Sequence, residues 1–313
     1  MKVAIIGAAG YVGKLLVQAH VARGDTVHAL ARKPSGVPAL AGVTVHAADV
    51  TVPAAIPDEF FDGAHVVYHC AAEISNEALM RAVNVEATRA LLQRARGKIG
   101  RWVQLGSLSV YGTPRRGVID EDSVPRPRSL YGQTKLESDA AVVEAARDAF
   151  SYTLLRPAAV IGRRMRSGSM RALIEAVARG RFCYIGSRGA IGNFVHEDNM
   201  VEALLLCATH EAAKDRTFNL SQNVTLEAMV AAIAQGLGRP APRARIPETL
   251  ARLAAQAGRL APAFPLTPAR VDALTSRVQY RSVRIERELE YRPRAAVEDA
   301  LRDLVADRAR PVP

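Results

Sequence analysis

The sequence predicts an α/β fold, in which a doubly wound parallel sheet is followed by a smaller, interleaved C-terminal lobe. Two observations support this prediction. Up to about residue 157, short runs rich in β-branched and aromatic residues alternate with stretches long enough to be helices. Beyond residue 157 the pattern becomes irregular, with loops rich in glycine, serine and arginine. Strands separated by helices join through right-handed crossovers, which produces a buried parallel sheet.

The first half of the chain contains the regular elements. Strands are predicted at residues 3–6, 26–31, 43–47, 66–70, 102–105 and 152–155, and helices at 11–23, 76–96 and 131–150. In the second half we predict a strand at 193–195 and helices at 170–179, 198–210, 225–237 and 297–307. Residues 239–268 hold seven prolines or glycines and little periodicity, so a loop-rich cap is expected there.

Composition excludes several classes of protein. Hydrophobic residues make up 49% and charged residues 23% of 313 residues, which is unlike disordered, collagen-like or fibrous chains. Three cysteines with no C-x-x-C pair argue against a disulfide framework and a structural zinc site. We therefore expect no metal and a reducing, cytoplasmic location. No run approaches the roughly 20 apolar residues that a membrane span requires.

The net charge is +11, and residues 157–313 carry most of the excess. We do not expect nucleic acid as a partner, because no long basic run is interleaved with aromatic residues. The strongest local imbalance lies between residues 163 and 188, where seven arginines face the single acid Glu175. Arginine can hold a phosphate bidentately, so at least one of them is expected to contact an anionic substrate. The alternative is a solvated basic surface.

A glycine-rich turn directly follows the first predicted strand. It consists of Gly7, Ala8, Ala9, Gly10, Tyr11, Val12 and Gly13, and a helix begins within it. Glycines permit a tight turn and close approach of the backbone to a pyrophosphate, whose charge is favoured at a helix N-terminus. In this strand–turn–helix context the motif predicts a dinucleotide site of the Rossmann type, to which we assign Gly7, Ala9, Gly10, Tyr11, Val12 and Gly13.

The second predicted strand ends in Ala31-Arg32-Lys33, without the carboxylate that would bind the ribose 2′-hydroxyl of NAD. Two cations suit a 2′-phosphate, so NADP(H) is favoured over NAD(H); alternatively, Arg32 only stacks on the adenine. Other residues near the ends of strands complete the expected cofactor site, namely Asp49, Val50, Ala71, Ala72 and Pro157. The dinucleotide-binding domain is expected to span residues 1–157 and to receive about 191–237, leaving 158–190 and 238–313 as the substrate-binding lobe.

A second group of residues carries acid–base chemistry. Ser107 follows the fifth predicted strand, and Tyr131 and Lys135 are spaced i, i+4 on one face of a predicted helix. A nearby ammonium favours the phenolate, which makes Tyr131 a credible general acid or base. The hydroxyl of Ser107 can hold a substrate oxygen.

Together these motifs resemble the extended short-chain dehydrogenase/reductase family. The resemblance rests on Gly7, Gly10, Gly13, Asp49, His69-Cys70-Ala71-Ala72, residues 84–88 and 107–112, Tyr131, Lys135, Arg156-Pro157 and residues 194–199. It implies that Tyr131 exchanges the proton, Lys135 holds the nicotinamide ribose and Ser107 binds the substrate oxygen. It further implies a small-molecule substrate contacted by Glu73, Ser109, Tyr111, Arg164, Arg166 and His196, and a homodimer through the helices at 76–96 and 131–150.

The resulting functional hypothesis is an NADP(H)-dependent oxidoreductase that interconverts a secondary alcohol and a ketone. A nucleotide-linked sugar is the first expected substrate, and a hydrophobic alcohol of sterol or flavonol type the second. One alternative is a nucleotide-sugar 4-epimerase with tightly retained NAD. Another is a dinucleotide-sensing regulator without turnover, against which the presence of Ser107, Tyr131 and Lys135 argues.

Overall fold

The computed structural model describes residues 1–163, 165, 167–257 and 266–309. A seven-stranded sheet forms the centre of the larger lobe, and all its neighbouring strands run parallel. In spatial order its strands are β11 (Arg216–Leu220), β7 (Ser151–Pro157), β5 (Ile99–Leu105), β4 (Ala64–His69), β1 (Lys2–Ile6), β2 (Thr26–Ala31) and β3 (Val43–Ala47). This sheet confirms the predicted fold class. Chain order reverses between β1 and β4, and in open α/β sheets ligands bind at that switch point.

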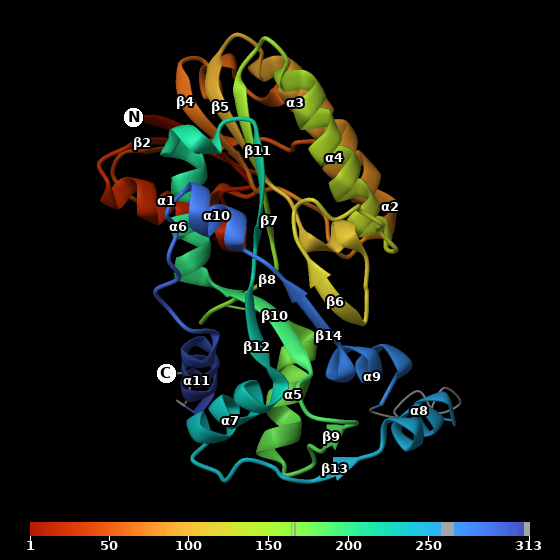
Figure 1. The fold of residues 1–313 in the computed structure, drawn as a ribbon. Helices are drawn as coiled ribbons and strands as arrows, with labels where there is room; N and C mark the ends of the chain where they lie inside the picture. The colour runs from red at the N-terminus through yellow and green to blue at the C-terminus, as the bar shows by residue number, and fades with distance from the viewer. Residues whose placement is uncertain (164, 166, 258–265, 310–313) are drawn as a thin grey trace.

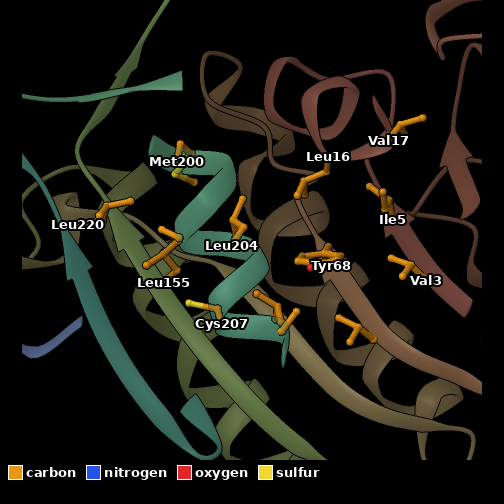
Figure 2. Packing of buried hydrophobic residues seen from close by; sticks show 14 of the residues in the cluster. Val3, Ile5, Leu16, Val17, Tyr68, Leu155, Met200, Leu204, Cys207 and Leu220 are labelled. Atoms are coloured by element: carbon orange, nitrogen blue, oxygen red, sulfur yellow. The ribbon is translucent and has the colours of Figure 1, made fainter. Parts of the chain in front are cut away.

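Helices cover both faces of the sheet (Figure 1). One face carries α1 (Tyr11–Ala22), α6 (Glu197–Thr209) and α10 (Val283–Glu288); the other carries α2 (Glu77–Arg81), a π-helical turn (Ala82–Glu86), α3 (Ala87–Ala95) and α4 (Leu130–Ala146). Figure 2 shows the first face, where Leu16 of α1 and Leu204 of α6 pack over Ile5 and Leu155. Their burial removes apolar area from water and fixes both helices against the sheet.

The smaller lobe is built around a second sheet. Its three strands are β12 (Gln222–Thr225), β10 (Ile191–His196) and β8 (Ala159–Ile161). The helices α5 (Gly168–Ala178), α7 (Leu226–Gly236) and α11 (Val297–Ala309) share one core, in which Met170, Val230 and Leu301 are buried. Two strand pairs extend the lobe, β9 (Tyr184–Ile185) with β13 (Arg245–Ile246) and β6 (Arg116–Ile119) with β14 (Arg277–Tyr280).

The chain passes between the lobes more often than the sequence suggests. Residues 191–237, expected with the dinucleotide-binding domain, divide: α6 and β11 join the larger sheet, whereas β10, β12 and α7 build the smaller lobe. Residues 283–291 return to the larger lobe, where Ile285 and Tyr291 are buried. The expectation of a loop-rich cap over 239–268 is wrong for residues 248–257, which form α8 (Glu248–Ala257). That helix buries Ala251 and Ala255 beside Val271 of α9 (Pro268–Thr275).

Candidate active site

The glycine-rich turn lies where β1 meets α1, and Gly7 and Gly13 have no room for a side chain there. Gly7 has φ +84°, and a Cβ there would lie 2.7 Å from the backbone nitrogen of Ala71 after β4. A Cβ on Gly13 would overlap the carbonyl oxygen of Gly7, which already accepts a 2.9 Å hydrogen bond from the N–H of Gly10. This exposed backbone at the first turn of α1 fits the pyrophosphate of a dinucleotide.

The remaining residues of the expected cofactor site line the ends of neighbouring strands. Ala9 and Val12 belong to the same turn, Ala71 and Ala72 follow β4, Val50 is buried close after β3, and Pro157 ends β7. All of these ends lie at the carboxyl edge of one parallel sheet.

Arg32 and Lys33 directly follow β2 and are both exposed. The guanidinium of Arg32 lies 3.9 Å from a carboxylate oxygen of Asp49, and its side chain is 69% exposed. The carboxylate of Asp49 also accepts hydrogen bonds from the N–H and hydroxyl of Thr51, and the Thr51 N–H is the main cause that lowers the pKa of Asp49. A guanidinium held loosely at this edge remains accessible to an anion.

Ser107 and Tyr131 meet at the carboxyl end of β5. Ser107 caps the short 3₁₀ helix Leu108–Tyr111, and its hydroxyl oxygen accepts 2.9 Å from the hydroxyl of Ser109. Tyr131 occupies the first turn of α4. Burial raises the pKa of Tyr131, while its hydrogen bond with Ser107 lowers it; the net shift is upward. The direction is opposite to the one expected from Lys135, because burial and the negative charge of Asp139 both raise the pKa, and Tyr131 is therefore protonated at neutral pH.

Lys135 lies one helical turn beyond Tyr131 and is only 2% exposed. Burial lowers its pKa, and the negative charge of Asp139 opposes that shift. Beside it, His69 at the end of β4 is buried, and neither of its ring nitrogens has a hydrogen-bond partner among the described residues. Burial and the charge of Lys135 lower the pKa of His69 to about 3, so this imidazole is neutral. Because His69 carries no charge, the negative charge that compensates the buried ammonium of Lys135 comes from Asp139.

Tyr111 does not face an open substrate site, although it was predicted to contact substrate. Its ring is 5% exposed, and its hydroxyl accepts 3.0 Å from Arg156 and donates 3.1 Å to Asn219. Arg156 in turn pairs with Asp139 at 2.9 Å. This buried network joins α4, β7 and β11, so the hydroxyl of Tyr111 is committed to the scaffold.

Glu73 shapes the loop between β4 and α2. Its Oε1 accepts hydrogen bonds from the backbone N–H groups of Ile74, Ser75 and Asn76, chiefly those of Asn76 and Ser75, which lower its pKa to about 2. Asn84, in the π-helical turn, binds both the N–H and the carbonyl of Glu73 and also donates to Thr134 of α4. Such turns recur at functional sites. No periodicity in the sequence indicates this one.

His196 caps α6 by accepting a 3.1 Å hydrogen bond from the N–H of Asp198. The next residue, Glu197, accepts 2.5 Å from the hydroxyl of Tyr11. Sequence analysis missed Glu197 as an individual residue, although it stands within residues 194–199. Its signal was a carboxylate at the junction of a predicted strand and helix.

The arginine-rich segment is partly neutralised. Arg163 lies 3.3 Å from Asp303, and Arg179 lies 2.5 Å from Glu175 one turn earlier in α5. Arg164 and Arg166, the two expected substrate contacts, lie outside the described residues. Within the described ranges, no three His, Cys, Asp or Glu side chains are grouped as a metal site would require. Over the same ranges, no helix has the length and apolar character to cross a membrane.

Comparison with known proteins agrees with this geometry. Residues 3–221 match the model of the NAD dependent epimerase/dehydratase family. Sterol demethylase protein B of Methylococcus capsulatus is 30% identical over 261 residues, which cover 80% of this chain and 79% of that protein. The 4-hydroxy-2-methyl-3-oxo-4-farnesyl-3,4-dihydroquinoline-1-oxide ketoreductase of Stigmatella aurantiaca is 27% identical over 274 residues, or 82% and 80% of the two chains.

Among solved structures, MoeE5 in complex with UDP-glucose and NAD aligns with a TM-score of 0.74 over 97% of both chains. The sequence identity is 24%, so this likeness shows the fold.

Proposed function

This chain belongs to the NAD dependent epimerase/dehydratase family, and we propose that it is an NADP(H)-dependent oxidoreductase that interconverts a secondary alcohol and a ketone. The observation that carries the proposal is the meeting of Ser107, protonated Tyr131 and buried Lys135 at the sheet edge that also holds the glycine-rich turn. A regulator that only senses a dinucleotide needs no such acid–base group.

The residues present fit a nicotinamide dinucleotide. Gly7, Gly10 and Gly13 would offer the backbone to its pyrophosphate, Arg32 and Lys33 would offer charge to a 2′-phosphate, and Lys135 would hold the nicotinamide ribose. When bound, the group supplies the hydride that a ketone carbon accepts, or takes one from an alcohol carbon.

Tyr131 supplies the proton. In the reductive direction its hydroxyl, which is protonated at neutral pH, donates to the ketone oxygen while Ser107 hydrogen-bonds the same oxygen. The resulting phenolate is stabilised by Lys135, whose charge Asp139 sustains, and it recovers a proton from solvent. In the oxidative direction Tyr131 first loses its own proton to solvent, and the resulting phenolate, stabilised by Lys135, accepts the alcohol proton.

An apolar polycyclic or isoprenoid ketone is the substrate class that we now place first, ahead of a nucleotide sugar. The sterol protein and the farnesyl-quinoline ketoreductase support this order. In addition, Arg163 and Arg179 are already paired with carboxylates, which weakens the case for a diphosphate at this segment.

The test measures consumption of NADPH with a 3-ketosteroid and with a UDP-4-keto sugar, using Ser107→Ala as the inactive control. Stoichiometric NADPH consumption with the ketosteroid is the expected result. Interconversion of UDP-glucose and UDP-galactose with no net consumption, together with co-purified NAD detected by mass spectrometry, would establish the epimerase alternative. NADPH binding without turnover of either substrate would indicate the regulator.

Two further expectations belong to this proposal. A homodimer is expected through α2–α3 and α4, where Leu79 is 46% and Val143 is 36% exposed; light scattering gives its mass. A cytoplasmic location is expected because Cys70, Cys183 and Cys207 are all free thiols.

A further inference from the structure

The carboxylate of Glu197 connects the glycine-rich turn to the smaller lobe. The hydroxyl of Tyr11, the first residue of α1, donates to Oε2 of Glu197 at 2.5 Å, within the range of charge-assisted O–H···O⁻ bonds. Oε1 of Glu197 accepts 3.2 Å from the backbone N–H of Arg163. One side chain thus contacts both the start of the cofactor turn's helix and the segment that enters the smaller lobe.

Gly162 shows how closely the three elements meet. A Cβ at this position would overlap the carboxylate of Glu197 and lie 2.5 Å from the hydroxyl of Tyr11. Gly162 directly follows β8, whose Ile161 pairs with His196 immediately before Glu197. The nearest atoms to such a Cβ all belong to the side-chain ends of Glu197 and Tyr11, so a methyl group at residue 162 would displace this contact first.

The junction extends into the C-terminal helix. The guanidinium of Arg163 pairs with Asp303 of α11 at 3.3 Å, and α11 shares its buried core with α5 and α7. A displacement at the start of α1 therefore has a continuous path of contacts into the core of the smaller lobe.

We propose that the Tyr11–Glu197 hydrogen bond is a positioning contact that couples dinucleotide binding at the glycine-rich turn to the order of the smaller lobe. This inference rests on the proposed function, because it takes the turn as the cofactor site. Tyr11 and Glu197 act through the lobe's placement and touch no reacting atom in the scheme. Binding of the cofactor to the turn would then order the smaller lobe, which carries some of the expected substrate-binding residues.

Hydrogen–deuterium exchange with and without NADPH tests the coupling without any substrate. In the wild type, NADPH is expected to slow exchange several-fold at residues 7–13 and also at 159–163 and 191–200. In Glu197→Ala and Gly162→Ala the effect at 7–13 persists, while the effect at the two distant segments falls below twofold. Tyr11→Phe is expected to reduce the distant effect in the same way.

Two controls separate coupling from loss of structure. Glu202→Ala removes a different carboxylate of α6, paired with Arg294 at 3.2 Å, and should respond like the wild type. Glu197→Gln keeps an acceptor oxygen and should restore at least half of the distant response. A wild type that responds at 7–13 alone, or a Glu197→Ala variant with an undiminished distant response, overturns the coupling. A wild type that does not respond even at 7–13 overturns the proposed cofactor function and the coupling with it.

Discussion

Oδ2 of Asp139 accepts a 2.9 Å hydrogen bond from Nε of Arg156, and both side chains are buried. The pair stands one helical turn beyond Lys135, and Arg156 continues the network to Tyr111. The second oxygen of Asp139 has no hydrogen-bond partner among the described residues. The Asp139 carboxylate thus serves two cations, Arg156 by direct contact and Lys135 through its charge.

Breaking this pair should be costly for stability. In Asp139→Asn the guanidinium of Arg156 remains buried without its counterion, a change that typically costs about 3–5 kcal/mol. Urea unfolding followed by circular dichroism measures it. Arg179→Ala, which removes an exposed pair with Glu175, is the control and should lose at most about 0.5 kcal/mol. A loss below about 1 kcal/mol in Asp139→Asn would show that the pair contributes little.

Tyr131→Phe removes the proton donor and keeps the ring. Turnover of the ketone that the wild type reduces should fall by about 10²–10⁴-fold, the usual contribution of a general acid. The dissociation constant of NADPH should change by no more than a few-fold, because the glycine-rich turn is untouched. Steady-state kinetics and fluorescence titration give the two values, and normal turnover would contradict the assignment.

Ser107 and Ser109 can be separated by their unequal places in the hydrogen-bond chain. The hydroxyl of Ser109 donates a hydrogen bond to the hydroxyl of Ser107, whereas Ser107 is the hydrogen-bond partner of Tyr131. Ser107→Ala should therefore lower kcat at least tenfold more than Ser109→Ala does. Equal losses in the two variants, or a larger loss in Ser109→Ala, would transfer the substrate-binding role to Ser109.

Arg32 should set the preference for NADPH. Hydrogen bonds to charged groups contribute about 1.5–3 kcal/mol, so the wild type should bind NADPH at least tenfold more tightly than NADH. In Arg32→Ala the ratio of the two dissociation constants should fall below about threefold, with NADH affinity little changed. Arg23→Ala is the control, because it removes an exposed guanidinium at the C-terminal end of α1, the end away from the glycine-rich turn. This variant should keep the wild-type ratio of the NADPH and NADH dissociation constants. Equal affinities in the wild type would refute this role.

Glu73 should stabilise the fold in a pH-dependent way. Its pKa is about 2 in the folded protein against an ordinary 4.5, so the folded state favours the carboxylate. The contribution is fully present above pH 4.5 and is lost progressively as the pH falls towards 2. Glu73→Gln should cost about 1 kcal/mol at pH 7, and the difference in Tm from the wild type should shrink between pH 4.5 and 3.

The control for this variant is Glu77→Gln, which removes a nearby charge at the start of α2. Its difference in Tm should stay below that of Glu73→Gln at pH 7. A Glu73→Gln difference that is independent of pH would show that the carboxylate hydrogen bonds are not the cause.

Local pattern was sufficient for much of this protein. The alternation of short apolar runs with helical stretches predicted the parallel sheet, because the hydrophobic periodicity that distinguishes a strand from a helix is a property of residues close together in the sequence. Gly7, Gly10 and Gly13 predicted a tight turn at the start of α1, because a side chain at Gly10 or Gly13 would crowd the backbone of Gly7, only a few residues away. The spacing of Tyr131 and Lys135 placed both on one helix face for the same reason.

Contacts between distant segments were decided only by the tertiary structure. Tyr11 and Glu197 are 186 residues apart, and nothing near either one indicates their hydrogen bond. The direction of the Tyr131 pKa shift likewise followed from burial, which depends on how the whole chain packs, and it is opposite to the direction expected from Lys135. The strands of segment 191–237 are divided between two sheets. Each strand pairs with a neighbour whose backbone N–H and C=O groups still lack partners, and the complete fold determines which neighbour that is.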